Sequence, residues 1–309
     1  MAGDSEGFKA VGKRLSNWGR WGSEDELGTL NFITPEKIVR AARLVRTGQA
    51  FELSLALDEA GPQRGVNGRN NPVHVMTIAD DVSFPAGMFL ADDMAILSLQ
   101  CATQWDSLAH VGYDKHLYNG VPIGVVTVKR GAMRNSIDKL GPRVVGRGVL
   151  LDIPRALGTE ILEGGYEITQ TDLELAEQRQ GVRVGSGDIL LLRTGWQQKL
   201  EQRDAASYMG NVAPGIGLDC CDWLHDRQVA AIASDTQAME VKPPRDPLAS
   251  HPIHMVLIRD MGMTLGEMFN LEALARGCAE DGVYDFFFSA PPLKITGAVG
   301  SPITPIVIK

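Results

Sequence analysis

The segments GVLLDI (148–153), DILLLR (188–193) and VAAIA (229–233) decide the fold class of this 309-residue chain. Each is a short run of Val, Ile, Leu and Ala with little polar interruption. Such runs are typical of strands that are covered on both faces, at the centre of a largely parallel sheet. Further strands are predicted at 51–57 (FELSLAL), 121–128 (VPIGVVTV) and 283–289 (VYDFFFS).

Helix signals are fewer than strand signals. The sequence Thr-Pro-Glu at 34–36 places a capping residue before proline and predicts a helix that ends at Gly48. The Thr-x-x-Glu patterns at 171–174 and 264–267 are capping boxes, and they predict that helices begin there. Together these elements predict a single α/β domain over residues 1–309, with a mixed central β-sheet and few covering helices.

Composition excludes several classes of protein. The net charge of −8 argues against non-specific nucleic-acid binding, because phosphate backbones require clustered Lys and Arg. No apolar run is long enough to cross a bilayer, and the first residues (MAGDSEGFKAVGKR) lack the apolar stretch of a signal peptide. Neither nucleic acid nor a membrane is therefore expected as a partner, and a cytoplasmic location is expected.

The four cysteines are Cys101, Cys220, Cys221 and Cys278, and none belongs to a Cys-x-x-Cys pair. Their spacing indicates neither a disulfide framework nor a thiolate zinc site. They are predicted to be ordinary buried thiols in a reducing compartment.

The densest group of polar side chains in an apolar setting lies at 100–110 (QCATQWDSLAH). Gln100, Gln104, Asp106 and His110 are separated by even numbers of residues, which on an extended segment sends all four to the same side. Converging amide, carboxylate and imidazole groups indicate a candidate active site. The alternative is a polar loop with a capping aspartate and a core histidine.

The same segment resembles the signature of the putative cyclase family, which includes bacterial kynurenine formamidases and isatin hydrolases. The family pattern is His-x-Gly-Thr-His-x-Asp-x-Pro-x-His. Three positions match it: Thr103, Asp106 and His110. Four depart from it: Gln100, Ala102, Gln104 and Leu108. The resemblance continues in order through 21–31 (WGSEDELGTLN), 148–153, 187–196 (GDILLLRTGW), 254–274 and 292–306 (PLKITGAVGSPITPI).

This resemblance implies a swivelling β/β/α fold, assembly into dimers or tetramers, and a site for zinc or manganese. Asp106 is the expected central ligand and His110 the expected general acid and base. A downstream histidine and glutamate, His254 and Glu267, would complete the site. His251 competes with His254, because both lie in the sequence HPIH.

The two glutamines alter the metal chemistry that the resemblance implies. Gln100 and Gln104 would offer neutral amide oxygens where the family has imidazoles. Such oxygens suit a harder ion such as Mn²⁺ better than Zn²⁺. They are candidate metal ligands. Alternatively the site holds no metal, and both amides bind substrate.

Trp105 within the signature, and His116 and Tyr118 after it, are also predicted to contact substrate. On an extended segment Trp105 points away from Gln104 and Asp106, so that it packs or covers the wall of the pocket. For Glu267 the competing interpretation is the capping box described above, in which its carboxylate bonds to the backbone of Thr264. Asp235 and Glu240 follow a predicted strand, and they are interpreted as solvated loop residues.

The function that the resemblance implies is hydrolysis of an amide, cyclic amide or lactone bond of a small molecule. Water would be activated by a divalent metal, by His110 with Asp106, or by both. Two alternatives stay open: a metal-free lyase or isomerase that moves a proton beside a carbonyl, and a non-catalytic small-molecule binding protein.

Overall fold

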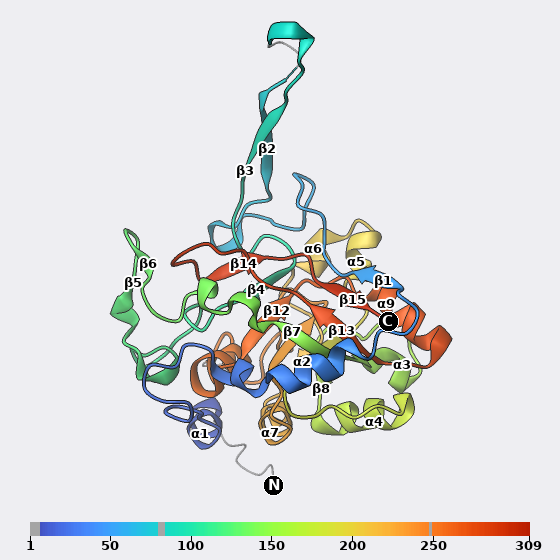
Figure 1. Cartoon of the computed structure of the whole chain (residues 1–309). Helices are drawn as coiled ribbons and strands as arrows, with labels where there is room; N and C mark the ends of the chain where they lie inside the picture. Colours follow the sequence, from blue (N-terminus) through green and yellow to red (C-terminus); the bar gives the residue numbers. More distant parts are fainter. Residues whose placement is uncertain (1–6, 80–83, 247–248) are drawn as a thin grey trace.

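The computed structural model describes residues 7–79, 84–246 and 249–309. Within these residues nine strands form one mixed sheet, in which the neighbours β7, β9, β11 and β12 run parallel (Figure 1). In sheet order the strands are β1 (Ala50–Glu52), β15 (Ile306–Ile308), β13 (Asp285–Ser289), β7 (Val145–Asp152), β9 (Ile189–Arg193), β11 (Ala231–Ser234), β12 (Thr264–Glu267), β4 (Gln104–Asp106) and β14 (Gly300–Pro302).

The apolar runs form the parallel centre of this sheet, as predicted. Along β7 the side chains of Val149 and Leu151 enter one core cluster, while Leu150 enters a second cluster on the opposite face. All three are fully buried. The sheet is therefore covered on both sides, which explains why its central strands are apolar at consecutive positions.

Helices form the two outer layers. Residues of α1, α4, α7 and the π-helix η8 pack in the first core cluster, and residues of α2 and α9 pack against the second. The helices are α1 (Phe8–Arg14), α2 (Pro35–Ala42), α3 (Ile153–Leu157), α4 (Gln170–Gln180), α5 (Gln198–Glu201), α6 (Ala205–Tyr208), α7 (Asp219–Asp226), α8 (Pro252–His254), η8 (Met255–Met261) and α9 (Glu272–Asp281). Short 3₁₀ turns are η1 (Gly28–Phe32), η2 (Val66–Gly68), η3 (Pro85–Gly87), η4 (Tyr118–Gly120), η5 (Ile123–Val125), η6 (Ile137–Lys139) and η7 (Gly141–Arg143).

At several places the structure differs from the element that the local sequence pattern predicts. The predicted helix start at 264–267 is wrong: these residues are strand β12, because backbone pairing with β11 and β4 outweighs the local capping pattern. Helix α4 forms as predicted, but its capping box uses Thr169 and Asp172. The predicted strands at 51–57 and 121–128 shrink to β1 and to β5 (Val126–Thr127), which pairs only with β6 (Gly131–Ala132).

Two further strand pairs lie outside the large sheet. Strands β8 (Glu167–Ile168) and β10 (Gly215–Ile216) are parallel. Strands β2 (Val73–Ile78) and β3 (Asp92–Ile96) form a hairpin that projects away from the body of the molecule (Figure 1). This hairpin, with its connecting segment, is called the arm below. Its exposed apolar side chains are Val73, Val75, Met76, Met88, Phe89, Leu90, Met94 and Ile96.

All four cysteines are buried and free, as predicted. Burial raises the pKa of each thiol, in Cys278 to about 11, so thiolate chemistry is disfavoured. None of the helices in the described residues is long and apolar enough to span a membrane.

Candidate active site and metal centre

Strands β4 and β12 bring together acidic residues that are far apart in the sequence. They are antiparallel, and Glu267 lies directly opposite Gln104. Asp106 lies two residues beyond Gln104, so its side chain leaves the same face of the sheet. The Gln104 amide nitrogen donates to Glu267 Oε2 at 3.0 Å and approaches Asp106 Oδ1 at 3.5 Å. All three side chains are buried.

Trp105 explains why this small strand is held so firmly. Its side chain leaves the opposite face, packs edge-on against Phe269, and donates from Nε1 to the carbonyl of Ala290 at 2.9 Å. The ring passes over Gly266, where an added Cβ would lie 2.6 Å from a ring carbon. Glycine at 266 is thus required for the close approach that sets the register of Asp106 and Glu267.

His254 completes the group from a different element, the short helix α8. Its Nε2 lies 3.1 Å from Glu267 Oε1 and 3.9 Å from Asp106 Oδ2. Its Nδ1 lies 2.5 Å from Glu240 Oε2. A carboxylate behind a ligating histidine fixes the orientation of the ring, as in many metal sites. The structure therefore places His254 in the cluster. His251 lies beside it, with the two ring centres 5.4 Å apart.

Charge in the cluster is strongly perturbed. Burial raises the pKa of Asp106, and the Glu267 carboxylate adds to this while the His110 and His254 rings oppose it. Burial would lower the pKa of His254, but the carboxylates of Glu240 and Glu267 overcome burial and raise it well above its ordinary value. His254 thus lies among three acidic side chains, Asp106, Glu240 and Glu267, which favour the protonated form of its ring.

The donor set fits a divalent cation. Ligand atoms of Asp106, His254 and Glu267 all lie within 4.8 Å of one another. Asp106 Oδ2 and Gln104 Oε1 are buried and have no hydrogen-bond partner among the described residues. Unpaired buried oxygens are costly, and a cation would satisfy the carboxylate oxygen. In the present orientation Gln104 turns its nitrogen, and not its oxygen, toward the carboxylates.

His110 stands at the wall of an open cavity above this cluster. Its Nε2 lies 3.8 Å from Asp106 Oδ1. His110 lines a cavity of about 850 Å³ together with Glu267 and His254. Gln100 also lines the cavity. Its amide lies over Gly300, where a Cβ would meet Nε2 at 2.4 Å.

The extended segment predicted for residues 100–110 is wrong. Within it only Gln104–Asp106 is strand, and Gln100 lies in a turn. A second turn ends at His110, whose backbone N–H donates to the carbonyl of Ser107 at 3.0 Å. The four side chains nevertheless gather at one site, because the turns on either side of β4 bend back over it.

Three predicted substrate contacts lie elsewhere. Trp105 is in the core, and neither His116 nor Tyr118 is among the residues that line the cavity. Tyr118 is fully buried and donates to Asp25 Oδ2 at 2.9 Å. The ring nitrogen Nδ1 of His116 contacts the backbone of Asp114 at 2.8 Å.

Thr103 has a structural role at the rear of the site. Its hydroxyl donates to the carbonyl of Met268 at 2.5 Å and accepts from the backbone of Leu55 at 2.8 Å. Met268 has φ of 58°, a left-handed conformation that is unfavourable for a non-glycine residue. The contact thus secures a strained turn directly after Glu267.

The interpretation of Asp235 and Glu240 as solvated loop residues is wrong, since both are fully enclosed. Glu240 orients His254, as described above. Asp235 accepts hydrogen bonds from Thr194 and Gly195. The available signal was their position just after β11, because polar residues at the carboxyl ends of parallel strands commonly face a site.

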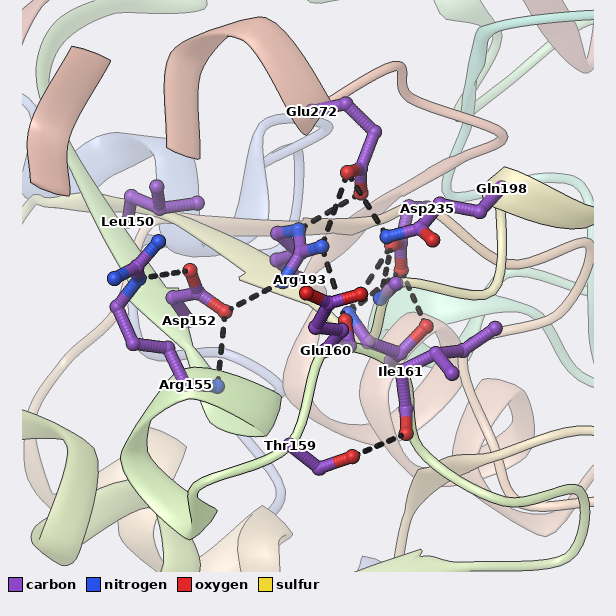
Figure 2. Close-up of polar contacts among 12 residues, drawn as sticks. Leu150, Asp152, Arg155, Thr159, Glu160, Ile161, Arg193, Gln198, Asp235 and Glu272 are labelled. Carbon is purple, nitrogen blue, oxygen red and sulfur yellow. Dashed lines mark hydrogen bonds and ion pairs between the residues drawn. The ribbon is translucent and has the colours of Figure 1, made fainter. Parts of the chain in front are cut away.

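A second polar cluster lies at the ends of β7 and β9, as Figure 2 shows. Arg193 donates to both Glu272 oxygens at 2.8 and 3.0 Å and to Asp152 at 2.8 Å. These partners satisfy the buried charges and tie α9 to the sheet. The role of this cluster is therefore structural.

Known proteins resemble this chain in sequence and fold. Residues 51–241 match the family model described as "Putative cyclase". A structure described as that of a novel cyclase is 41% identical, with a TM-score of 0.89, and the match covers 96% of this chain and 100% of that one.

More distant structures share the fold. Isatin hydrolase A from Ralstonia solanacearum is 22% identical (TM-score 0.65), and the match covers 84% of this chain and 92% of that one. An isatin hydrolase bound to the product analogue thioisatinate is 17% identical (TM-score 0.62; 89% and 98% covered). No match was found among curated proteins. The family model spans well over half of the sequence, and the chain therefore belongs to the putative cyclase family.

Proposed function

We propose that this chain is a metal-dependent hydrolase that cleaves an amide, cyclic amide or lactone bond of a small molecule. The observation that carries the proposal is the convergence of Asp106, His254 and Glu267, of which His254 and Glu267 line an open cavity together with His110. Membership of the family, and structural neighbours that include isatin hydrolases, support the same reaction class.

Asp106, His254 and Glu267 would hold the cation. Two carboxylates and one imidazole form an oxygen-rich donor set, which suits Mn²⁺ better than Zn²⁺. A bound divalent cation would supply Lewis-acid polarisation of the scissile carbonyl and a lowered pKa of water. Glu240 keeps the His254 ring in place, and Gln104 holds the Glu267 carboxylate by donating to Oε2.

His110 is the group placed to move a proton. It is partly exposed to the cavity, whereas Asp106 behind it is buried. The role assigned to it is to take a proton from water and return it to the leaving nitrogen or oxygen. Asp106 Oδ1, at 3.8 Å, stabilises the charged ring that forms when the proton is taken.

The test is a screen of cyclic amides, linear amides and lactones against protein stripped with chelator and then reloaded with Mn²⁺ or Zn²⁺. Turnover that requires the metal, with a product heavier by one water, is expected. A product of unchanged mass would indicate an isomerase, a product lighter than the substrate a lyase, and binding without turnover a binding protein.

Glu240→Gln is expected to weaken Mn²⁺ binding by about tenfold to a hundredfold, because the neutral amide no longer fixes the His254 ring. Calorimetric titration of the stripped protein measures this. Glu24→Gln, on an exposed loop, is the matched control and should bind as the wild type does. Equal affinities of wild type and Glu240→Gln would contradict the role of Glu240.

We also propose that the chain assembles with copies of itself through the arm. An isolated two-stranded hairpin is only marginally stable in water, yet this one exposes a row of large apolar side chains. A second copy packed on the arm would cover them.

The expected result is that the wild type elutes as a dimer or tetramer, measured by light scattering. The triple variant Phe89→Ser, Met94→Thr, Ile96→Thr should shift toward the monomer, because these side chains are exposed on the arm. A monomeric wild type, or an unchanged mass in the variant, would contradict assembly through the arm.

A further inference from the structure

Arg69 is a positively charged side chain at the cavity, and no described residue pairs with it directly. It lines the cavity with Glu267 and His110 and is half-buried. Within residues 7–79, 84–246 and 249–309, no group forms a hydrogen bond or ion pair with its guanidinium. Among the described residues that line the cavity, Arg69 is the one Arg or Lys and Glu267 the one acid.

The loop that carries Arg69 is fixed in place. Asn71 accepts from the backbone of Gln63 at 2.8 Å and donates to the carbonyl of Gly61 at 2.9 Å. Asn70, which directly follows Arg69, donates from its backbone N–H to Ser98 Oγ at 3.1 Å. These bonds join both roots of the arm and fix the backbone next to Arg69.

Gln63 strengthens this link. Its amide nitrogen donates to the carbonyls of Gln100 and Cys101 at 3.2 and 3.0 Å. The loop of Arg69 is thereby tied to the segment that leads into β4. The charge of the guanidinium also acts on Asp106, where it opposes the rise in pKa that burial causes.

The cavity is therefore lined by groups of opposite charge. Glu267 and His254, which line it, belong to the candidate metal site. The wall of the cavity presents Arg69 together with neutral polar groups of Asn67, Gln237 and Ser250. A guanidinium that has no direct partner among the described residues is suited to bidentate recognition of a planar anion.

Given the proposed function, we propose that the substrate carries a carboxylate in addition to the bond that is cleaved, and that Arg69 binds this carboxylate. Arg69 is thus a specificity-determining residue. It orients the substrate with its anionic end on the wall and its scissile carbonyl toward the candidate metal site.

The experiment measures equilibrium binding of matched probes, in excess Mn²⁺ and again after chelation. The pairs are pyrrolidone carboxylate with its carboxamide, butyrolactone carboxylate with its carboxamide, and acetamidobenzoate with acetamidobenzamide. Wild-type protein should prefer the carboxylate of at least one pair by at least about tenfold, the effect of one charge-assisted contact.

Arg69→Gln should abolish that preference while leaving carboxamide binding unchanged, and Arg69→Lys should keep part of it. Arg64→Gln, an exposed arginine of the same loop, is the matched control and should keep all of it. A preference that survives in Arg69→Gln overturns the proposal, because the carboxylate would then bind elsewhere, for example at the metal.

A panel in which no carboxylate is preferred by the wild type overturns the proposal as well. Failure of the hydrolase assignment is distinguishable, because binding is measured without turnover. Loss of metal-dependent hydrolysis with an intact, Arg69-dependent preference would refute the reaction and leave the anion site standing.

Discussion

Asp106→Asn is expected to lower turnover at least about a hundredfold and to weaken the binding of divalent metal. Asp106 contributes one oxygen toward His254 and the other toward His110, so a neutral side chain removes charge from both the cation and the proton-transfer histidine. Calorimetric titration with Mn²⁺ and steady-state rates on the substrate found by the screen measure the two effects.

The variant should fold. Burial raises the pKa of Asp106, which means that the folded protein disfavours its charged form, and an amide relieves this cost when no metal is bound. The metal-free variant is therefore expected to unfold at a temperature no lower than the wild type. Asp138→Asn, whose carboxylate bonds with Ser136 and Gly297, is the control for loss of an acid outside the site. Wild-type rates in folded Asp106→Asn would refute the assignment.

His110→Ala is expected to lower turnover at least about a hundredfold while metal affinity stays near that of the wild type. The reason is that His110 faces the cavity and lies outside the group formed by Asp106, His254 and Glu267. Comparing the rate with the affinity for Mn²⁺ in one preparation separates proton transfer from metal binding.

His116→Ala is the matched control, because this histidine does not line the cavity and should be replaceable at small cost. A His110→Ala protein that turns over at the wild-type rate would remove His110 from the mechanism. Parallel losses in His110→Ala and His116→Ala would point to a general effect of histidine removal on folding.

The parallel centre of the fold could be predicted because burial on both faces leaves a direct mark on composition. The composition of residues 188–193 predicts a buried strand without reference to the rest of the chain, and strand β9 forms there. The segment 264–267 could not be read in the same way. Its local pattern favours a helix start, and the decision depends on pairing with β4, more than 150 residues earlier.

The site was predictable in part, for a different reason. Even spacing indicates Asp106 and His110, the resemblance adds His254 and Glu267, and the structure brings all four together at one cavity. The sequence predicts a solvated loop residue at Glu240, because it lies in a polar run after a strand. Its burial depends on contact with His254 of helix α8. Nothing in the local sequence indicates that Arg69 lies at the cavity, because its position depends on hydrogen bonds between its loop and residues that precede and follow it.

Strand β4 has consequences for laboratory evolution of this protein. Trp105 belongs to the interior while its two neighbours, Gln104 and Asp106, belong to the candidate metal centre. A library that randomises Trp105 or Gly266 should yield few folded clones, because the indole ring and the glycine are in close contact. New selectivity should instead be sought in the loops 67–69 and 98–100, which line the cavity.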